Sequence, residues 1–274
     1  MNARPQRRAA SEPKTRLDVW LTERGLADSR QKAQALVMAG RVRVDGAPAL
    51  KPGLAVRPAS SVVVLPGPEH VGRGAVKLAG ALDAFGVDPA GRIAVDVGAS
   101  TGGFTETLLA RGARRVYAVD VGRAQLHERL RRDPRVVSRE RINARRLTPH
   151  EVPEPCGLAA VDVSFISVLK ILPSLRGILS PDADVIVLVK PQFEVGRRQV
   201  GRGGLVLDPS LHLAVLRQVA RAATEVLGYV LAGAAASPIT GADGNREFFL
   251  HLRCLGPGLG PADAEAHLAR AVQP

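Results

Sequence analysis

The chain has 274 residues, of which 46% are hydrophobic and only 3% aromatic, and its formal net charge is +12. This length suits one ordinary domain and a smaller one, whose cores must be packed mainly by Val, Leu and Ala. No run of about 18 uncharged apolar residues could span a membrane, and Cys156 and Cys254 lack the spacing of a zinc site or a disulfide scaffold. We therefore expect a cytoplasmic protein without a metal or a membrane partner.

The positive charge is concentrated near the N-terminus, where residues 1–60 hold 12 Lys and Arg against 5 Asp and Glu. Residues 1–14 lack the apolar stretch of a secretory signal and are expected to form a disordered basic tail. A concentrated positive field suits a polyanion, either nucleic acid or an anionic membrane face. The alternative is that the arginines only keep the protein soluble.

The segment after this tail has the pattern of a small α+β domain. Leu17, Trp20 and Leu21 share one face of a short helix. Asp28 or Ser29 can cap a second helix. The alternating stretch RVRV then meets DG, which is a strong hairpin signal, and SVVVL supplies another strand.

Residues 15–64 resemble the S-four-type RNA-binding module, because SRQKAQALVMAGRVRVDG keeps the module's order of cap, helix, glycine and hairpin. The resemblance implies RNA binding by the basic side chains at the matching positions, which are Arg16, Arg30, Lys32, Arg41 and Arg43. The alternative is a generic helical hairpin with a solvated charged face.

A Pro/Gly-rich linker at residues 65–73 leads to a second domain, residues 74–254, in which strands alternate with helices. Strands are expected at RIAVDV, RVYAVD, RVVS, LAAVDV, ADVIVLVK, YVLAGAAAS and REFFLHLRC, and helices near 74–85, 103–111, 123–132, 168–178 and 209–227. This pattern predicts an α/β fold with a doubly wound, mostly parallel sheet and an antiparallel last strand. Residues 255–274 are expected to form a loosely packed tail with a short helix.

The stretch DVGASTGGF, residues 96–104, forms a glycine-rich turn between a strand and a helix. A Walker-type loop is excluded because there is no lysine, and the dinucleotide fingerprint is excluded by the glycine spacing. The remaining spacing is typical of S-adenosylmethionine sites, where a helix N-terminus can face the methionine carboxylate. The turn residues expected to bind this cofactor are Asp96, Gly98, Ser100, Thr101, Gly102, Gly103 and Phe104.

Two further residues are expected in the same site. Asp120 ends the next strand, 22 residues after Gly98, where it can accept hydrogen bonds from both ribose hydroxyls of an adenosine. Asn143 can reach the adenine edge, and Asp96 would hold the turn or the methionine ammonium. The alternative is that both carboxylates only cap helices or bond loop amides.

Four charged residues stand at strand ends or loop edges: Lys77, Asp162, Lys190 and Glu247. Isolated buried charges are costly, so two lysines and two carboxylates should pair with one another on the rim that carries the glycine turn. The alternative is a set of surface salt bridges at loop edges.

This set matches the K-D-K-E tetrad of FtsJ-type ribose 2′-O-methyltransferases. With the N-terminal module, the chain resembles the TlyA family, sometimes labelled hemolysin A, through RGAVKL, DVGASTGGFTE, DVSFIS, VKPQFEVG, DPSLH and GNREFFL. The resemblance implies a Rossmann-like class I fold, S-adenosyl-L-methionine as cofactor, ribosomal RNA and ribosomal subunits as partners, and methylation of cytidine 2′-hydroxyls. The chain departs from the family's usual pattern at PEHVGRGAVKL in the linker and at VGRAQL after Asp120.

These residues suggest a mechanism in which Lys190 touches the 2′-oxygen and Asp162 lies between Lys190 and the sulfonium. Lys77 and Glu247 would fix the network. The Arg- and Gly-rich loop at residues 195–206 either covers the site and contacts RNA phosphate or is a solvated loop. Two rival functions are an RNA-binding protein without catalysis and a membrane-lytic hemolysin, although the sequence lacks a strongly amphipathic basic helix.

Overall fold

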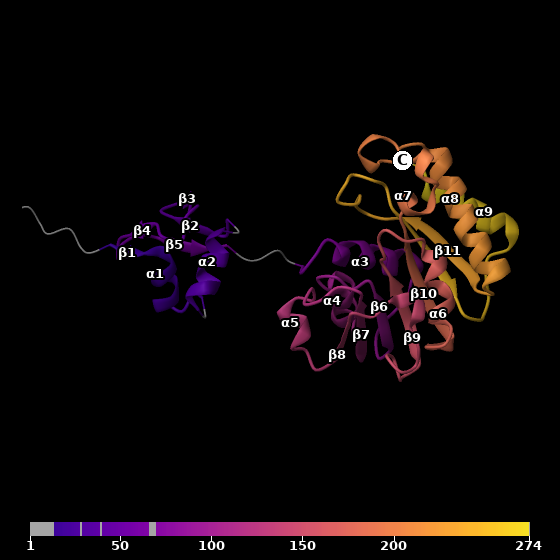
Figure 1. The fold of residues 1–274 in the computed structure, drawn as a ribbon, viewed down its shortest axis with the longest axis horizontal. Coiled ribbons are helices and arrows are strands. Elements are labelled where there is room, and N and C mark those ends of the chain that lie inside the picture. The colour runs from indigo at the N-terminus through magenta and orange to yellow at the C-terminus, as the bar shows by residue number, and fades with distance from the viewer. Residues whose placement is uncertain (1–13, 28, 39, 66–69, 274) are drawn as a thin grey trace, which may run out of the picture. The chain divides into compact units, whose positions relative to one another are not determined.

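The computed structural model describes residues 14–27, 29–38, 40–65 and 70–273. The chain forms two compact units, Met1–Glu69 and His70–Pro274, and each is described by itself (Figure 1). The disordered tail expected for residues 1–14, apart from its last residue, and the possible helix cap Asp28 lie outside the described residues.

The first unit packs two helices against short antiparallel strands. Its elements are β1 (Thr15–Arg16), α1 (Leu17–Glu23), α2 (Arg30–Met38), β2 (Val42–Val44), β3 (Ala47–Pro48), β4 (Ala55–Val56) and β5 (Val62–Val64). The Ser29 hydroxyl accepts the amide of Lys32 at 3.2 Å and so caps α2. Asp45 and Gly46 both have positive φ, as the two-residue hairpin between β2 and β3 requires. The expected helices and hairpin are present, and the β1–β4 pair is an addition.

The second unit is built on one seven-stranded sheet in the order β11-β12-β10-β9-β6-β7-β8. The strands are β6 (Ile93–Val97), β7 (Arg115–Asp120), β8 (Val136–Glu140), β9 (Cys156–Val161), β10 (Leu179–Val189), β11 (Val230–Ala236) and β12 (Phe248–Arg253). Neighbouring strands from β10 through β8 run parallel, whereas β12 is antiparallel to both β10 and β11. The predicted mostly parallel sheet with an antiparallel last strand is confirmed.

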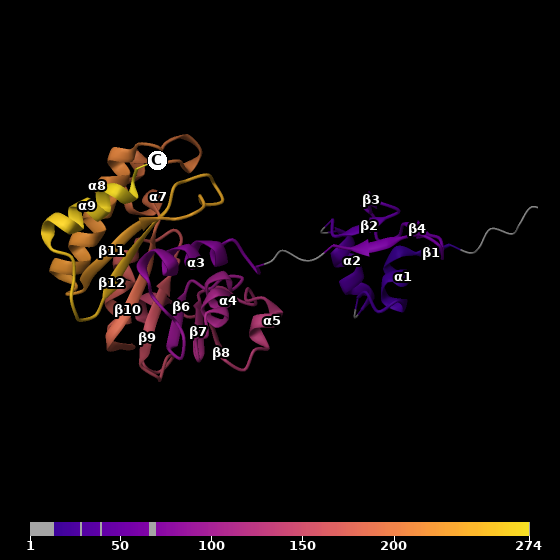
Figure 2. The ribbon, with the colours of Figure 1, turned by 180° about the vertical axis from the view of Figure 1, so that it is seen from behind.

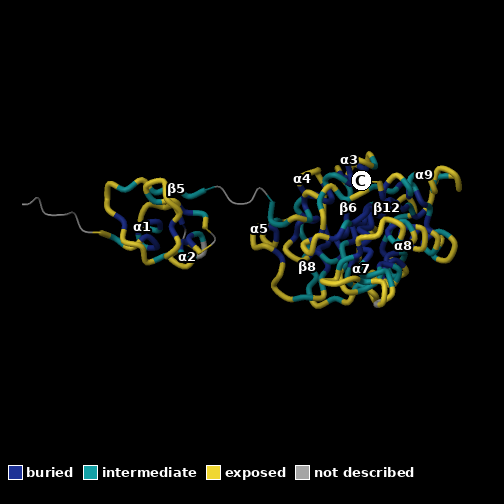
Figure 3. Tube along the Cα trace, turned by 90° about the horizontal axis from the view of Figure 1, so that it is seen from above, coloured by how far each residue is buried: buried dark blue, intermediate teal, exposed yellow. Residues whose placement is uncertain are grey.

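Helices cover both faces of this sheet and make a three-layer sandwich (Figure 2). They are α3 (Gly74–Phe85), α4 (Gly103–Ala110), α5 (Glu128–Arg131), α6 (Leu172–Leu175), α7 (Pro191–Glu194), α8 (Pro209–Arg221) and α9 (Pro261–Ala271). Alternate strand residues face opposite sides. One set packs with α3, α4 and α5, and the other with α6, α8 and α9. The central strands are therefore buried on both faces (Figure 3).

Three expected elements differ from the structure. The helix near 123–132 shrinks to the single turn α5, because Ala124 has positive φ and His127 caps the chain just before it. The helix near 168–178 is divided into a 3₁₀ turn and α6, with Pro173 in the first turn of α6. The C-terminal segment forms the expected short helix, α9, but the expectation of loose packing is wrong, since Leu268 and Ala271 are buried in the core.

Candidate active site

The glycine turn after β6 brings three strand ends close together. Gly98 has a φ of +88°, and a Cβ at this position would lie 2.1 Å from the carbonyl oxygen of Asp162. Gly102 has a φ of +99°, and its Cβ would lie 2.3 Å from Leu130. Both positions therefore require glycine, one for the approach of β9 to the turn and the other for the packing of α5.

Asp96 lies buried beneath this turn and ties it to α4. Its Oδ2 accepts hydrogen bonds from the Thr105 amide at 2.8 Å and the Thr105 hydroxyl at 2.7 Å, while its buried Oδ1 has no hydrogen-bond partner among the described residues. Burial raises the pKa of Asp96 to about 7 against the effect of Thr105, and the charges of Asp162 and Asp120 add to the rise. Asp96 was expected to hold either the turn or the methionine ammonium, and the contact with Thr105 is of the first kind.

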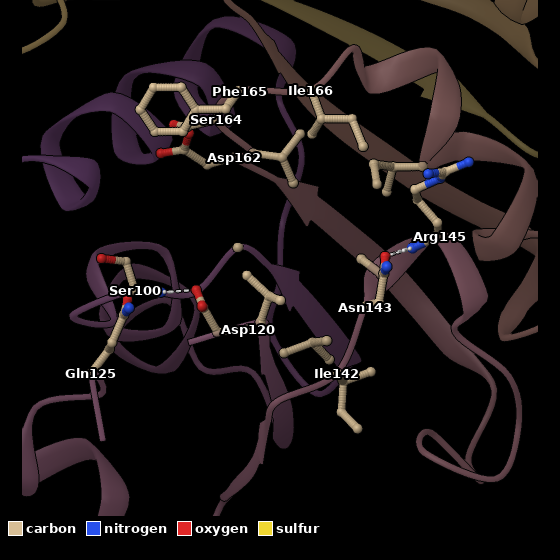
Figure 4. A pocket seen from close by; sticks show the side chains of 16 residues that line it. Ser100, Asp120, Gln125, Ile142, Asn143, Arg145, Asp162, Ser164, Phe165 and Ile166 are labelled. Atoms are coloured by element: carbon tan, nitrogen blue, oxygen red, sulfur yellow. Dashed lines mark hydrogen bonds between the residues drawn. The ribbon is translucent and has the colours of Figure 1, made fainter. Parts of the chain in front are cut away.

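A cavity of about 580 Å³ opens at the carboxyl ends of β6, β7 and β9 (Figure 4). Asp120 points into it, and its two oxygens accept the amides of Ser100 at 2.8 Å and Gly122 at 2.7 Å. Asn143 also lines the cavity and caps a short turn by accepting the Arg145 amide at 3.1 Å. Each Asp120 oxygen keeps a second lone pair for a further donor.

A smaller cavity of about 110 Å³ lies next to the first and shares Gly98, Ser100 and Asp162 with it. Its other walls come from the start of α3 and the start of α4. The predicted residues that line it are Gly98, Ser100, Thr101, Gly103, Phe104 and Asp162. Gly103 is needed here because a Cβ would lie 2.9 Å from the Ala75 amide nitrogen.

The four charged residues form two close ion pairs. Lys77 Nζ lies 2.5 Å from Glu247 Oε2, and their side chains are only 9% and 3% exposed. Lys190 Nζ lies 2.5 Å from Asp162 Oδ1, with side-chain exposures of 10% and 20%. Such burial distinguishes these pairs from solvated surface salt bridges.

The sheet register places the pairs at one edge. Val187 is opposite Val161, and Val189 is opposite Phe248. Asp162 and Lys190, which follow β9 and β10, and Glu247, which precedes β12, therefore lie at the same edge of the sheet. Asp162, Lys190 and Glu247 are therefore neighbours at the edge that carries the glycine turn. Within the described residues, no hydrogen bond or ion pair joins one pair to the other.

Several cavity residues were not expected from the sequence. The side chains that join the predicted set are Gln125, Ile142, Arg145, Ser164, Phe165 and Ile166. Ser164 accepts a hydrogen bond from Lys190 Nζ at 2.9 Å. Phe165 is 90% exposed with a φ of +64°, and its ring centroid lies 5.1 Å from that of Phe193. The sequence signal for both residues was their place in the motif DVSFIS, in the loop that follows the strand end at Asp162.

In the first unit, two of the basic residues expected to bind RNA are engaged by an internal carboxylate. The buried Asp18 accepts hydrogen bonds from Arg16 at 3.1 and 3.0 Å, from Arg30 at 3.1 Å and from Gln34 at 2.9 Å. The Arg16 guanidinium, despite the opposing effect of burial, holds the pKa of Asp18 well below its usual range, with Gln34 and Arg30 helping. Arg16 and Arg30 nevertheless remain 53% and 56% exposed.

The other three basic residues of this set differ in their surroundings. Arg41 donates two hydrogen bonds, at 3.3 and 3.0 Å, to the carbonyl oxygen of Leu65. Lys32 and Arg43 are exposed. Arg43 lies on β2, and no hydrogen bond or ion pair joins its guanidinium to another of the described residues.

The loop at residues 195–206 is anchored at its C-terminal end. Asn245 accepts the amide of Val206 at 2.9 Å and donates to the carbonyl of Gly204 at 3.0 Å. His212 Nε2 bonds the Val206 carbonyl at 2.7 Å. Asn245 and His212 are each only 1% exposed, so buried side chains hold the end of the loop at Val206, while residues 201–204 are exposed.

Comparison with known proteins agrees with this geometry. The FtsJ-like methyltransferase family model matches residues 70–254, and the S4 domain model matches residues 15–62. A 16S/23S rRNA (cytidine-2′-O)-methyltransferase TlyA from Mycobacterium tuberculosis is 53% identical over 242 residues, which cover 88% of this chain and 90% of that protein. The chain belongs to the TlyA family. Its TlyA-type second unit is thus an FtsJ-like methyltransferase domain.

Two other relatives extend this comparison. A protein named Hemolysin A from Brachyspira hyodysenteriae is 37% identical over 240 residues, covering 86% of this TlyA chain and 98% of that protein. The solved structure of a hemolysin candidate from Streptococcus thermophilus is 40% identical, with a TM-score of 0.70 and coverage of 95% and 96%. No helix in the described part of the chain is long and apolar enough to cross a bilayer. The described residues also contain no group of three His, Cys, Asp or Glu side chains able to hold a metal.

Proposed function

We propose that this TlyA chain transfers a methyl group from S-adenosylmethionine to a cytidine ribose 2′-hydroxyl of ribosomal RNA. The observation that carries the proposal is the pair of buried lysine–carboxylate contacts at the sheet edge beside the glycine turn. The relative from Mycobacterium tuberculosis, which is named as a 16S/23S rRNA (cytidine-2′-O)-methyltransferase, supports the choice of substrate.

The larger cavity fits the adenosine end of S-adenosylmethionine. Asp120 stands at its wall with spare lone pairs for the two ribose hydroxyls, and Asn143 offers an amide to an adenine edge. The side chain of Ile142 provides an apolar surface for the base. The smaller cavity, with the start of α4 at its wall, suits the amino-acid end.

The bound cofactor supplies a methyl group that is already activated by a sulfonium. Alignment of the acceptor oxygen with this group can lower the activation free energy by an amount on the order of 7–11 kcal/mol. Lys190 Nζ carries three N–H groups, of which one donates to Ser164, and the ammonium forms an ion pair with Asp162 at 2.5 Å. We assign a second N–H to the 2′-oxygen, where it orients the hydroxyl and stabilises the negative charge on the oxygen as the hydroxyl proton passes to solvent water.

The remaining residues hold this arrangement and bring the RNA to it. The Lys77–Glu247 pair fastens α3 to the start of β12, directly beside Lys190 in the sheet register. Phe165, exposed at the cavity, offers an aromatic face on which an unpaired base can stack. The S4 domain supplies Arg43 and Lys32, and the exposed parts of Arg16 and Arg30, to RNA phosphates.

The test is a Lys190→Ala variant of the full chain with a Lys170→Ala control, since Lys170 is exposed. We expect Lys190→Ala to abolish methyl transfer to ribosomal RNA while calorimetric binding of S-adenosylmethionine stays near normal. Lys170→Ala should retain both. Near-wild-type turnover in Lys190→Ala would remove Lys190 from the mechanism.

A further inference from the structure

The loop after β9 and the segment after β10 are joined by a row of side-chain contacts. Asp162 and Ser164 both contact Lys190 Nζ, at 2.5 and 2.9 Å. Phe165 packs against Phe193, with ring centroids 5.1 Å apart. The sequence motifs DVSFIS and VKPQFE are therefore joined by side-chain contacts at several positions, and the DVSFIS side of these contacts lines the cavity.

A carboxylate closes the far end of this row. Glu194 Oε2 accepts the Ser167 hydroxyl at 2.7 Å, and Glu194 Oε1 accepts the Val168 amide at 2.8 Å. Burial raises the pKa of Glu194, and the two hydrogen bonds oppose that rise. Because Glu194 accepts hydrogen bonds from Ser167 and Val168, the loop that carries Ser164 is fixed relative to the segment that carries Lys190.

We infer that Ser164 is a positioning residue for methyl transfer, whose hydroxyl fixes the direction in which the free N–H of Lys190 points. This inference rests on the proposed function. An ammonium group held only by an ion pair, as with Asp162, can turn about its Cε–Nζ bond. The directional hydrogen bond to Ser164 removes this freedom, so an N–H not used in that bond is oriented before the RNA arrives.

The surroundings of Ser164 indicate that its hydroxyl can be removed without lowering the stability of the fold. Ser164 is exposed and lines the cavity, and the hydrogen bond from Lys190 is the one observed for its side chain in the described structure. Removing its hydroxyl therefore leaves no buried group without a partner, and Asp162 still neutralises Lys190. The fold should tolerate Ser164→Ala without a change in melting temperature.

The kinetic test compares full-length Ser164→Ala, Ser164→Thr and the control Ser210→Ala, whose exposed serine lies at the start of α8. A hydrogen bond to a charged group is worth enough to lower kcat by about 10- to 100-fold in Ser164→Ala. The dissociation constant for S-adenosylmethionine and the KM for RNA should change less than about twofold. Ser164→Thr, which keeps the hydroxyl, should recover most of the loss. A Ser164→Ala enzyme with wild-type kcat would overturn the inference.

A second readout needs no activity. The chain has six lysines, so the side-chain ammonium signals in a ¹⁵N NMR spectrum are few, and Lys190→Arg identifies the one from Lys190. In the wild type this signal should persist at a pH where exposed lysines are lost to solvent exchange, and Ser164→Ala should broaden or remove it. If Ser164→Ala leaves it unchanged, Ser164 does not hold Lys190. If the wild type methylates no RNA but the signal is lost in Ser164→Ala, the positioning stands and the proposed reaction fails.

Discussion

The Lys77–Glu247 pair offers a way to separate the stability of the site from its chemistry. Both side chains are more than nine-tenths buried, and their charged atoms lie 2.5 Å apart. Removing one partner of a buried ion pair leaves the other charge uncompensated, which typically costs about 3–5 kcal/mol. Replacing both partners by apolar residues of similar volume is often neutral or stabilising.

We therefore predict that Lys77→Met and Glu247→Leu each lower the free energy of unfolding by about 3–5 kcal/mol. For a unit of about 200 residues this corresponds to a fall in Tm of about 6–20 °C. The double variant Lys77→Met/Glu247→Leu should return to within about 3 °C of the wild-type Tm. Methyl transfer should stay strongly reduced in all three variants, because each removes a charged group from the sheet edge next to Lys190.

The assay is thermal unfolding followed by calorimetry, with methyl transfer to ribosomal RNA measured on the same preparations. Arg217→Met is the matched control, since the Arg217–Glu265 pair is about half exposed and should cost no more than about 1 kcal/mol. Single variants within 2 °C of the wild-type Tm, or a double variant that loses the sum of the two single losses, would refute the buried-pair reasoning.

Four further predictions follow from the geometry. In the folded protein the pKa of Asp96 is raised to about 7 from its usual 3.8. The contribution of the protonated Asp96 carboxyl to the free energy of unfolding is therefore fully present below about pH 4 and is lost as the pH rises to 7. The Tm gain of Asp96→Asn over wild type should thus be larger at pH 8 than at pH 5, and pH-independent gains would contradict this. Gly98→Ala should lower the free energy of unfolding by about 2–4 kcal/mol, because of backbone strain and overlap with the end of β9. Gly91 also has a positive φ but open space around it, so Gly91→Ala should lower it by only about 1–2 kcal/mol. Equal losses in the two variants would argue against the close approach of β9 to Gly98. Arg43→Ala should reduce the salt dependence of RNA binding by about 0.7–0.9 in log–log slope, and an unchanged slope would remove Arg43 from the interface. Phe165→Ala should lower kcat/KM for RNA by about 5- to 100-fold, from about 1–3 kcal/mol of stacking, without changing S-adenosylmethionine binding; wild-type kinetics would exclude stacking on Phe165.

Local patterns were enough to predict the framework of the site. A strand, a glycine turn and a helix in sequence determine where the carboxyl edge of a parallel sheet lies. Strand-end positions then bring Asp162, Lys190 and Glu247 to that edge, whatever the details of side-chain packing. The pairing of the charges followed from the cost of burying them alone.

Features that depend on tertiary contacts were not predictable in the same way. Arg30 carried the pattern of an exposed basic face, but its contact with Asp18, 12 residues away, exists only once α1 and α2 pack together. The short α5 follows from a positive φ at Ala124, a residue whose side chain gives no such signal. The contact of Ser164 could not be predicted for a related reason, because its partner Lys190 is 26 residues away in the sequence.

The most direct test of the proposed reaction is a map of modified nucleosides in ribosomal RNA. Ribosomal subunits from cells lacking the gene would be incubated with the purified chain and isotopically labelled S-adenosylmethionine, then digested and analysed by mass spectrometry. The account predicts label on the ribose of 2′-O-methylcytidine, absent when Lys190→Ala replaces the wild type. Label on a base, or equal labelling by both proteins, would contradict it.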